Sequence, residues 1–536
     1  MKSKITFITF LAFQVTSISL SGKAEPDEFI RKKAEELQSG LSVELRGELI
    51  YCETILPKFY LRRDFEPAWS SYDLDDLKQI LADAELHGLD PFDYHYAAIL
   101  KASNGLSSIE QAELDLVLTD AFLLYASHFL NGKINPETVD SEWKAIRREG
   151  NALEFLELAL LVPHLADEFA SLAPQHQGYA DLKGVLARYK SIESRGGWKV
   201  IPEGETLKPG MIDWDRVPLI VDRLKQTGDI DSDFIRSPEY TEQLSLAIEA
   251  YQIRNGLDPD GHIGKATLVA LNESVKTRIG QIMINLERYR WIAQGLGDHY
   301  VMVNIANYRM EVYKDGALTF QEKVIVGKPF RKTPVFSGKM TYLVFNPTWT
   351  VPPTILFDDI LPEVKKSTEY LKTKNMVVLK GQGSSLEVVD PETVDWSSLS
   401  RNYFPYTLRQ QPGPTNALGL VKFMFPNAHN VYIHDTPSKE LFNRVNRAFS
   451  SGCIRLDRPM EFAKYLLQED ESWNAAKIAG VLKEGIERSV ILKHPLPVHI
   501  LYLTSWVKDG QVQFRKDLYE RDLPVLEALK SKPPSL

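Results

Sequence analysis

The sequence has 536 residues, of which 44% are hydrophobic and 25% are charged, and these are ordinary values for a globular protein with a sizeable core. Its formal net charge of −9 and the lack of a basic run argue against a nucleic-acid partner. No cluster of His, Cys, Asp and Glu has the spacing of metal ligands, and no glycine-rich phosphate loop occurs, so neither a metal nor a cofactor is expected.

Residues 1–24 have the features of a secretory signal peptide. Lys2 and Lys4 precede a mostly apolar run over residues 5–15, and small and polar residues follow as far as Ala24. This order predicts export, with cleavage after Ala24. The run is short for a membrane span, and an uncleaved N-terminal anchor is the alternative. No later segment has an apolar run of spanning length, so a soluble mature chain is expected.

Residues 25–230 are predicted to form a mainly helical domain. Apolar residues recur at helical spacing between Leu114 and Tyr125 and again between Leu153 and Leu161. The sequence His87-Gly88-Leu89-Asp90-Pro91 is typical of a loop between helices. This region shows no grouping of reactive side chains, so its histidines are interpreted as structural.

Residues 235–275 are predicted to form a smaller unit. Asp260-Gly261 indicates a tight turn, and Gly264-Lys265-Ala266-Thr267 opens a short helix. Together with Ala250-Tyr251-Gln252, these residues resemble a compact three-helix peptidoglycan-binding module. The resemblance implies docking rather than catalysis, and a degenerate module that only packs against its neighbours is the alternative.

Residues 297–525 are predicted to be rich in β-strands. Strand-like segments flank Asp315-Gly316, and a strand, an Asp-Gly turn and a second strand are a strong hairpin signal. Residues 353–415 interrupt this pattern with a short helical stretch and polar, glycine-containing sequence. Such a long excursion is usually a lid, a binding loop or a disordered segment.

Two short segments of this β-rich region carry the reactive side chains. Residues 421–425 and 431–434 are predicted to pair as strands, and their alternation places Tyr432 and His434 on one face. Cys453 follows nineteen positions after His434, in a loop that leads into a helix. A lone cysteine is usually a small buried hydrophobe, and a lone histidine is usually structural, so the case for a nucleophile with its base depends on the resemblance of the surrounding motif to a known family.

A thiol that attacks an acyl carbonyl needs a partner that holds it as thiolate, room for the substrate, and donors for the oxyanion. An imidazolium at His434 would supply the first, because it lowers the pKa of a neighbouring cysteine. Gly452 lets a substrate backbone come close, since it has no Cβ. The main-chain N–H groups of Ser451, Gly452 and Cys453 are the candidate oxyanion donors.

His434 and the run Ser450-Ser451-Gly452-Cys453-Ile454-Arg455 resemble the signature of the L,D-transpeptidases, cysteine enzymes that cross-link peptidoglycan. Most members carry a second histidine where Ser451 stands, and the large branch with an added helical scaffold domain shares this departure. The resemblance implies Cys453 as the nucleophile and His434 as the general base.

The resemblance also implies roles for three neighbours. The main-chain carbonyl of Asp435 would orient the imidazole, in the place that an Asp side chain takes in a triad. Arg455 would bind substrate or order the site, with a purely structural ion pair as the alternative. Tyr432 shares the face of His434 and is counted among the substrate-facing residues. If Cys453 is the nucleophile, a disulfide to Cys52 would silence the enzyme, so Cys52 is interpreted as buried and structural.

The resemblance covers nearly the whole mature chain and implies an α+β multidomain fold. The parts would be a helical scaffold domain, a three-helix module, and a β-rich catalytic domain whose insertion at 353–415 acts as a lid that excludes water. The implied reaction joins the third-position diamino acids of two peptidoglycan tetrapeptide stems, through a thioester on Cys453 and with release of D-Ala.

Partners and rivals follow from the same resemblance. Wall synthases and carboxypeptidases are expected partners, carbapenems are expected inhibitors that acylate Cys453, and a Gram-negative periplasm is the expected location. The thioester could instead pass to water, to a free D-amino acid or to a lipoprotein amine, as in an L,D-carboxypeptidase, an exchange enzyme or a lipoprotein-anchoring enzyme. A wall-binding scaffold without activity is the rival of a different class.

Overall fold

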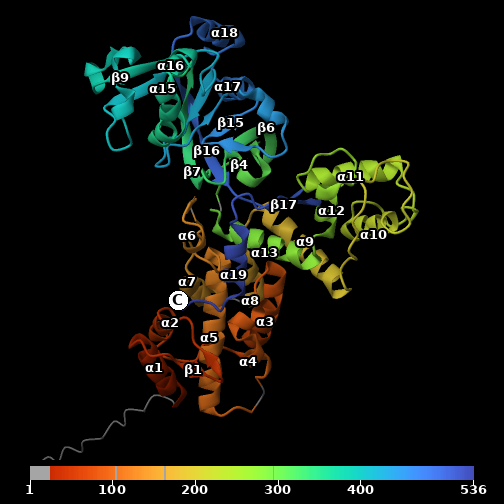
Figure 1. The fold of residues 1–536 in the computed structure, drawn as a ribbon. Coiled ribbons are helices and arrows are strands. Elements are labelled where there is room, and N and C mark those ends of the chain that lie inside the picture. The colour runs from red at the N-terminus through yellow and green to blue at the C-terminus, as the bar shows by residue number, and fades with distance from the viewer. Residues whose placement is uncertain (1–24, 103–104, 146, 162–163, 294) are drawn as a thin grey trace, which may run out of the picture.

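The computed structural model describes residues 25–536 except 103–104, 146, 162–163 and 294. The predicted signal peptide, residues 1–24, lies outside the described residues. Figure 1 shows a helical N-terminal region in red and orange, a smaller helical unit in yellow, and a β-rich domain in green and blue. The predicted α+β multidomain fold is confirmed. In the described part of the chain, no helix has both the length and the apolar character needed to cross a bilayer.

The N-terminal region is built around one long helix, α5. The Ser107 side chain accepts a hydrogen bond from the Glu110 N–H, and the Glu110 side chain accepts one from the Ser107 N–H, so the two residues form a capping box. From Ala112 to Phe129 nearly every residue is buried, as expected of a helix surrounded by others. The helices of the region are α1 Glu25–Gln38, α2 Leu56–Arg62, α3 Ser71–Ala82, α4 Tyr96–Leu100, α5 Ser108–Asn131, α6 Pro136–Val139, α7 Ala152–Ala159, α8 Leu165–Ser171 and α9 Gln177–Ser194.

Two helices from later in the chain complete this region. Helix α13, Val275–Trp291, packs on α9, and α19, Asp522–Lys530, packs on α13. In Figure 1 the blue α19 lies among the orange helices, and the C-terminus lies beside them. The Leu536 N–H donates to the Tyr51 carbonyl at 2.7 Å. The scaffold is therefore assembled from both ends of the described chain.

The smaller unit has its own hydrophobic core and begins earlier than predicted. Its helices are α10 Val217–Thr227, α11 Glu242–Arg254 and α12 Lys265–Asn272. Its core includes Ile201, Leu207 and the apolar face of α10, all of which were assigned to the scaffold. The predicted range 235–275 contains only α11 and α12 of these helices. The helical periodicity of α10 was readable, but periodicity does not tell which neighbour a face packs on.

The β-rich domain is built on one sheet that closes on itself. The sheet runs β12-β13-β15-β6-β5-β4-β16-β7, and β7 also pairs with β12. Short strand β14 pairs with β6. Its strands are β4 His299–Asn304, β5 Arg309–Lys314, β6 Ala317–Gly327, β7 Val335–Phe345, β12 Val421–Met424, β13 Ile433–His434, β14 Ala448–Ser450, β15 Ile454–Leu456 and β16 Arg488–Leu501. Helices α17 Pro459–Leu467 and α18 Ala475–Glu484 follow β15 in the chain. Strands β17 Ser505–Lys508 and β18 Gln511–Phe514 form a separate hairpin that lies against α9, α13 and α11.

The insertion after β7 is a folded subdomain, which we call the capping subdomain, residues 349–418. Its buried residues, among them Trp349, Trp396 and Leu408, form a core separate from that of the sheet. Its sheet has the order β10-β9-β11-β8. The elements are β8 Trp349–Thr350, α14 Pro353–Ile355, a π-helical turn Leu356–Ile360, α15 Leu361–Lys366, α16 Glu369–Thr373, β9 Met376–Lys380, β10 Glu387–Val389 and β11 Tyr406–Gln410.

A short segment of the scaffold enters the catalytic sheet. Strand β3, Trp143–Lys144, pairs in parallel with Val335 and Phe336 of β7, and the Val335 N–H donates to the Glu142 carbonyl at 3.1 Å. We call residues 140–144 the scaffold strap. It holds the helical region against the edge of the sheet that carries the candidate site.

Candidate active site

Adjacent parallel strands bring the predicted reactive residues together. Strand β13 pairs with β15 so that His434 lies opposite Arg455, and the Ile454 N–H donates to the Tyr432 carbonyl at 3.1 Å. This register places Cys453 beside Tyr432, one step before the paired residues. Because side chains alternate along a strand, Tyr432, His434, Cys453 and Arg455 share one face, and all four line the same cleft.

His434 is held as a neutral imidazole. Its side chain is 4% exposed, and its Nδ1 lies 2.5 Å from the main-chain carbonyl of Asp435. That contact leaves Nε2 as the ring nitrogen available to the cleft. Burial, followed by the nearby charge of Arg455, lowers the pKa of His434 to about 3. At neutral pH the ring can therefore accept a proton.

Cys453 is held as a neutral thiol. Its Sγ lies 3.8 Å from the Asn430 carbonyl, to which the thiol donates. Burial raises the pKa of Cys453, and the opposing contributions of Tyr432 and Arg455 are smaller. No hydrogen bond between Sγ and His434 occurs among the contacts of the described residues. An imidazolium that keeps Cys453 as thiolate was expected, but burial disfavours the charged form of both groups.

The turn before Cys453 presents main-chain donors. Gly452 has a φ of +114°, a conformation that residues with a Cβ rarely adopt. Its N–H donates to the Ser450 hydroxyl at 3.2 Å, so this candidate donor is already engaged. The N–H groups of Ser451 and Cys453 have no partner within the part of the chain that the structure describes. These two remain available to an oxyanion.

The side chains of Ser451 and Asp435 make structural contacts. The Ser451 hydroxyl accepts from Arg331 at 3.0 Å. The Asp435 carboxylate accepts from the Leu420 N–H at 2.8 Å and from the Thr436 N–H at 2.7 Å. The Asp435 carboxylate thus fixes the turn after β13, while the main-chain carbonyl of Asp435 contacts the His434 imidazole.

Arg455 lines the cleft without a carboxylate partner. Across residues 25–536, outside the undescribed positions, no Asp or Glu lies within ion-pair distance of its guanidinium, and its buried Nε has no hydrogen-bond partner. The alternative of a structural ion pair is therefore not supported. The charge of Arg455 lowers the pKa values of Cys453 and His434.

The cleft around Cys453 has a volume of about 1180 Å³. One wall comes from Trp349–Ile355 of the capping subdomain, and another from the cationic loop between β6 and β7, residues 328–334. Ser141 and Glu142 of the scaffold strap also line it. Sequence reasoning missed the β6–β7 loop and the scaffold strap as walls of the cleft, because both are far from Cys453 in the sequence and have no local pattern that marks a site.

Cys52 lies apart from the site. It is fully buried and is a free cysteine, as is Cys453. Its N–H donates to the Asp120 carboxylate at 2.7 Å. The prediction that Cys52 is buried and structural is confirmed.

Two families of known domains match this chain. Residues 54–186 match the scaffold domain, and residues 298–486 match the L,D-transpeptidase catalytic domain. A Haemophilus influenzae protein provisionally named an L,D-transpeptidase is 35% identical over 292 residues, which cover 53% of this chain and 58% of that protein. The chain thus spans less than two thirds of this curated relative.

Solved L,D-transpeptidases are also similar, at low identity. One in complex with imipenem is 12% identical, covers 38% of this chain and 59% of its own, and gives a TM-score of 0.16. That of Xylanimonas cellulosilytica is 11% identical, covers 56% of this chain and 99% of its own, and gives a TM-score of 0.18. The chain is therefore similar to the scaffold domain over residues 54–186 and to the L,D-transpeptidase catalytic domain over residues 298–486.

Proposed function

We propose that this protein is a peptidoglycan L,D-transpeptidase that forms cross-links between third-position diamino acids through a thioester on Cys453. The observation that carries the proposal is the shared face of Tyr432, His434, Cys453 and Arg455, at the cleft of the domain that is similar to this family. A thiol, an imidazole with a fixed tautomer and two unengaged N–H donors are the groups that acyl transfer needs.

In the first half-reaction, His434 Nε2 removes the thiol proton as Sγ attacks the carbonyl of the donor's third residue. Because His434 is neutral at rest, it acts as a general base during the attack. The Ser451 and Cys453 N–H groups receive the oxyanion. The imidazolium then protonates the leaving amine, the C–N bond breaks, and D-Ala departs from the thioester.

In the second half-reaction, the amine of another stem attacks the thioester. The neutral imidazole takes the proton of the attacking amine, the C–S bond breaks, and the thiol of Cys453 is restored. Water competes with the amine for the same thioester. The capping subdomain lines the cleft, and a cover over the thioester favours transfer over hydrolysis.

The setting of this reaction is part of the proposal. An N-terminal sequence of export type supports a periplasmic location, where tetrapeptide stems occur. Wall synthases and carboxypeptidases would supply the new wall and the tetrapeptide donors. A solved relative is in complex with imipenem, and a carbapenem is expected to acylate Cys453 here, because its strained lactam carbonyl is attacked as the donor carbonyl would be.

Mass spectrometry of products from the purified protein and a disaccharide-tetrapeptide tests this proposal, with Cys453→Ala run beside it. A cross-linked dimer that lacks one D-Ala, and that is absent with Cys453→Ala, is the expected product. Tripeptide alone would identify an L,D-carboxypeptidase, and incorporation of an added D-amino acid would identify exchange. No product from either protein, together with binding to sacculi, would favour the scaffold without activity.

A further inference from the structure

The direction of the Cys453 N–H is set by a threonine from a distant loop. Thr333 is fully buried, and its hydroxyl donates to the Gly452 carbonyl at 2.8 Å. The Gly452 carbonyl and the Cys453 N–H belong to one planar trans peptide, in which they point in opposite directions. A hydrogen bond that fixes the carbonyl therefore also fixes the N–H that would receive the oxyanion.

The Ser451 N–H is set in the same way. The Lys328 N–H donates to the Ser450 carbonyl at 3.0 Å, and that carbonyl shares a planar peptide with the Ser451 N–H. Lys328 and Thr333 lie at the two ends of the β6–β7 loop, residues 328–334. Both donors of the candidate oxyanion site thus depend on the position of this single loop.

The Tyr519 hydroxyl bridges the two ends of the β6–β7 loop. Its hydroxyl donates to the Gly327 carbonyl at 2.7 Å and accepts from the Thr333 N–H at 3.1 Å. The Thr333 hydroxyl in turn accepts from the Gly327 N–H at 2.9 Å. A side chain at position 327 would collide with the Arg331 carbonyl. Tyr519 is 2% exposed and does not line the cleft, so it acts on the site only through this loop.

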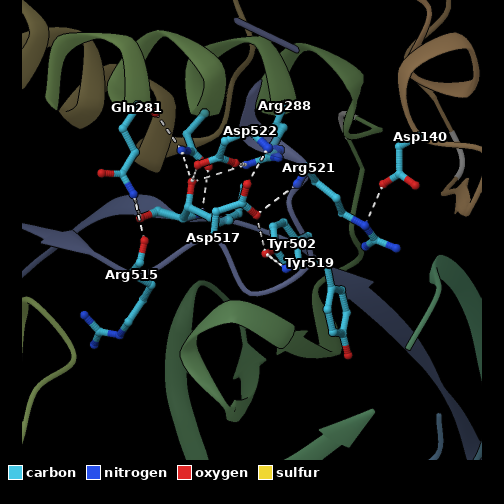
Figure 2. A network of polar contacts seen from close by, with 12 residues as sticks. Asp140, Gln281, Arg288, Tyr502, Arg515, Asp517, Tyr519, Arg521 and Asp522 are labelled. Carbon is cyan, nitrogen blue, oxygen red and sulfur yellow. Dashed lines mark hydrogen bonds and ion pairs between the residues drawn. The ribbon is translucent and has the colours of Figure 1, made fainter. Parts of the chain in front are cut away.

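The segment that carries Tyr519 is clamped to the scaffold strap (Figure 2). Arg521 forms an ion pair with Asp140 at 2.9 Å and with Glu142 at 3.1 Å. Its guanidinium also lies over the Tyr519 ring, 5.0 Å from the centroid. The side chains of Arg521 and Asp140 are largely buried, and a buried ion pair is strongly sensitive to the loss of one partner.

The same segment is anchored on helix α13. Asp522 forms an ion pair with Arg288 at 2.6 Å and accepts from Thr504 at 2.8 Å. Asp517 accepts from the Tyr502 hydroxyl at 2.7 Å, and that hydroxyl accepts from the Tyr519 N–H at 2.9 Å. An unbroken set of contacts therefore leads from the scaffold to the Gly452 carbonyl.

We propose that Tyr519 is a positioning residue for the oxyanion donors, and that its ion-paired neighbour Arg521 makes their position depend on the docked scaffold strap. The inference rests on the proposed function, because it concerns the rate of the same acyl transfer. The scaffold domain then regulates the catalytic site through Asp140, Arg521 and Tyr519, although none of these residues touches the substrate cleft.

Tyr519→Phe in the full-length protein removes only the hydroxyl. The loss of a whole oxyanion donor costs about 100-fold or more in kcat, and a misaimed donor should cost less, so we expect kcat for D-Ala release to fall about tenfold. KM should stay within about twofold, because the cleft walls are untouched. Tyr313→Phe is the matched control, since its hydroxyl contacts Glu311 on β5, away from the loop.

A second pair of variants keeps the test decisive if Tyr519→Phe does not fold. Thr333→Val keeps the side-chain shape and should lower kcat as Tyr519→Phe does, whereas Thr333→Ser, which retains the hydroxyl, should restore most of the rate. Asp140→Asn should lower kcat in the same direction. Wild-type kcat in Tyr519→Phe or Thr333→Val, per folded molecule, would overturn the positioning role, and wild-type kcat in Asp140→Asn would overturn the link to the scaffold. An inactive wild-type protein would instead refute the proposed function.

Discussion

The neutral resting state of Cys453 and His434 predicts an unusual pH dependence of thiol reactivity. With a His434 pKa of about 3, only about one ring in 10⁴ is protonated at pH 7. A cysteine with an ordinary pKa of about 8.5 is about 3% thiolate at pH 7, and burial places the Cys453 pKa higher. Alkylation of Cys453 at pH 7 should therefore run below about 3% of its high-pH limit.

The assay is the rate of iodoacetamide alkylation of Cys453 between pH 4 and pH 10, read by intact mass. We expect the rate to rise about tenfold per pH unit through the neutral range, without a plateau at low pH. Cys52 is fully buried, and Cys453→Ala gives the background. A thiolate–imidazolium pair would instead give a plateau from about pH 4 upward.

His434→Ala separates the two states of the pair. Because the ring carries no charge at rest, its removal should leave the alkylation profile of Cys453 nearly unchanged. Acylation by a carbapenem should nevertheless fall by about 100-fold to 10⁴-fold, since the general base is lost. An alkylation plateau in the wild-type protein that disappears in His434→Ala would refute our account of the site.

Three further outcomes are expected. Gly452→Ala should lower kcat by about 100-fold, because its φ of +114° is strained for a residue with a Cβ and relief of that strain would move the turn that carries the oxyanion donors; wild-type kcat would contradict this. Arg331→Ala removes the ion pair that holds Asp359 of the capping subdomain, so amide hydrogen exchange in that subdomain should become faster and KM should rise. Arg401→Ala removes an exposed ion pair within the subdomain and should change neither quantity. Burial holds the pKa of His87 at about 2 and of His128 at about 3, so below the unfolded pKa of about 6.5 the unfolded chain binds more protons. These two histidines together should lower the free energy of unfolding by up to about 3 kcal/mol per pH unit down to pH 3; a flat Tm between pH 7 and pH 4 would contradict this.

Local signals in the sequence were sufficient for single elements. Asp315 and Gly316 both have positive φ values, 51° and 78°, which the predicted hairpin turn requires, and β5 and β6 pair across them. The capping boxes of α3 and α5 are likewise local. Such features depend on residues three or four positions apart, so they can be read before any tertiary contact is known.

Tertiary choices could not be read in this way. The apolar face of α10 would suit either the scaffold or the smaller unit, and the structure places it in the latter. The resemblance implied a capping subdomain in the insertion at 353–415, but the residue pattern alone gave no sign of its core, because its buried residues, such as Trp349 and Leu408, are far apart in the sequence. Only their convergence makes a subdomain.

The candidate site divides along the same line. Strand alternation predicted that Tyr432 and His434 share a face, but the protonation state of His434 depends on burial and on Arg455 across the parallel pair. Thr333 and Tyr519 had no signal at all. A threonine in a loop and a tyrosine near α19 are common, and their roles come from hydrogen bonds to segments more than a hundred residues away.

The pairing of β3 with β7 has a consequence for any attempt to express the catalytic domain alone. Without Trp143 and Lys144, the main-chain groups of Val335 and Phe336 that face β3 would lie at an open sheet edge. Both side chains are buried, so this edge is apolar as well as unpaired, and edges of that kind recruit strands from other molecules. A truncated catalytic domain should therefore self-associate through β7, and the helical region, through the scaffold strap, also keeps the sheet from aggregating.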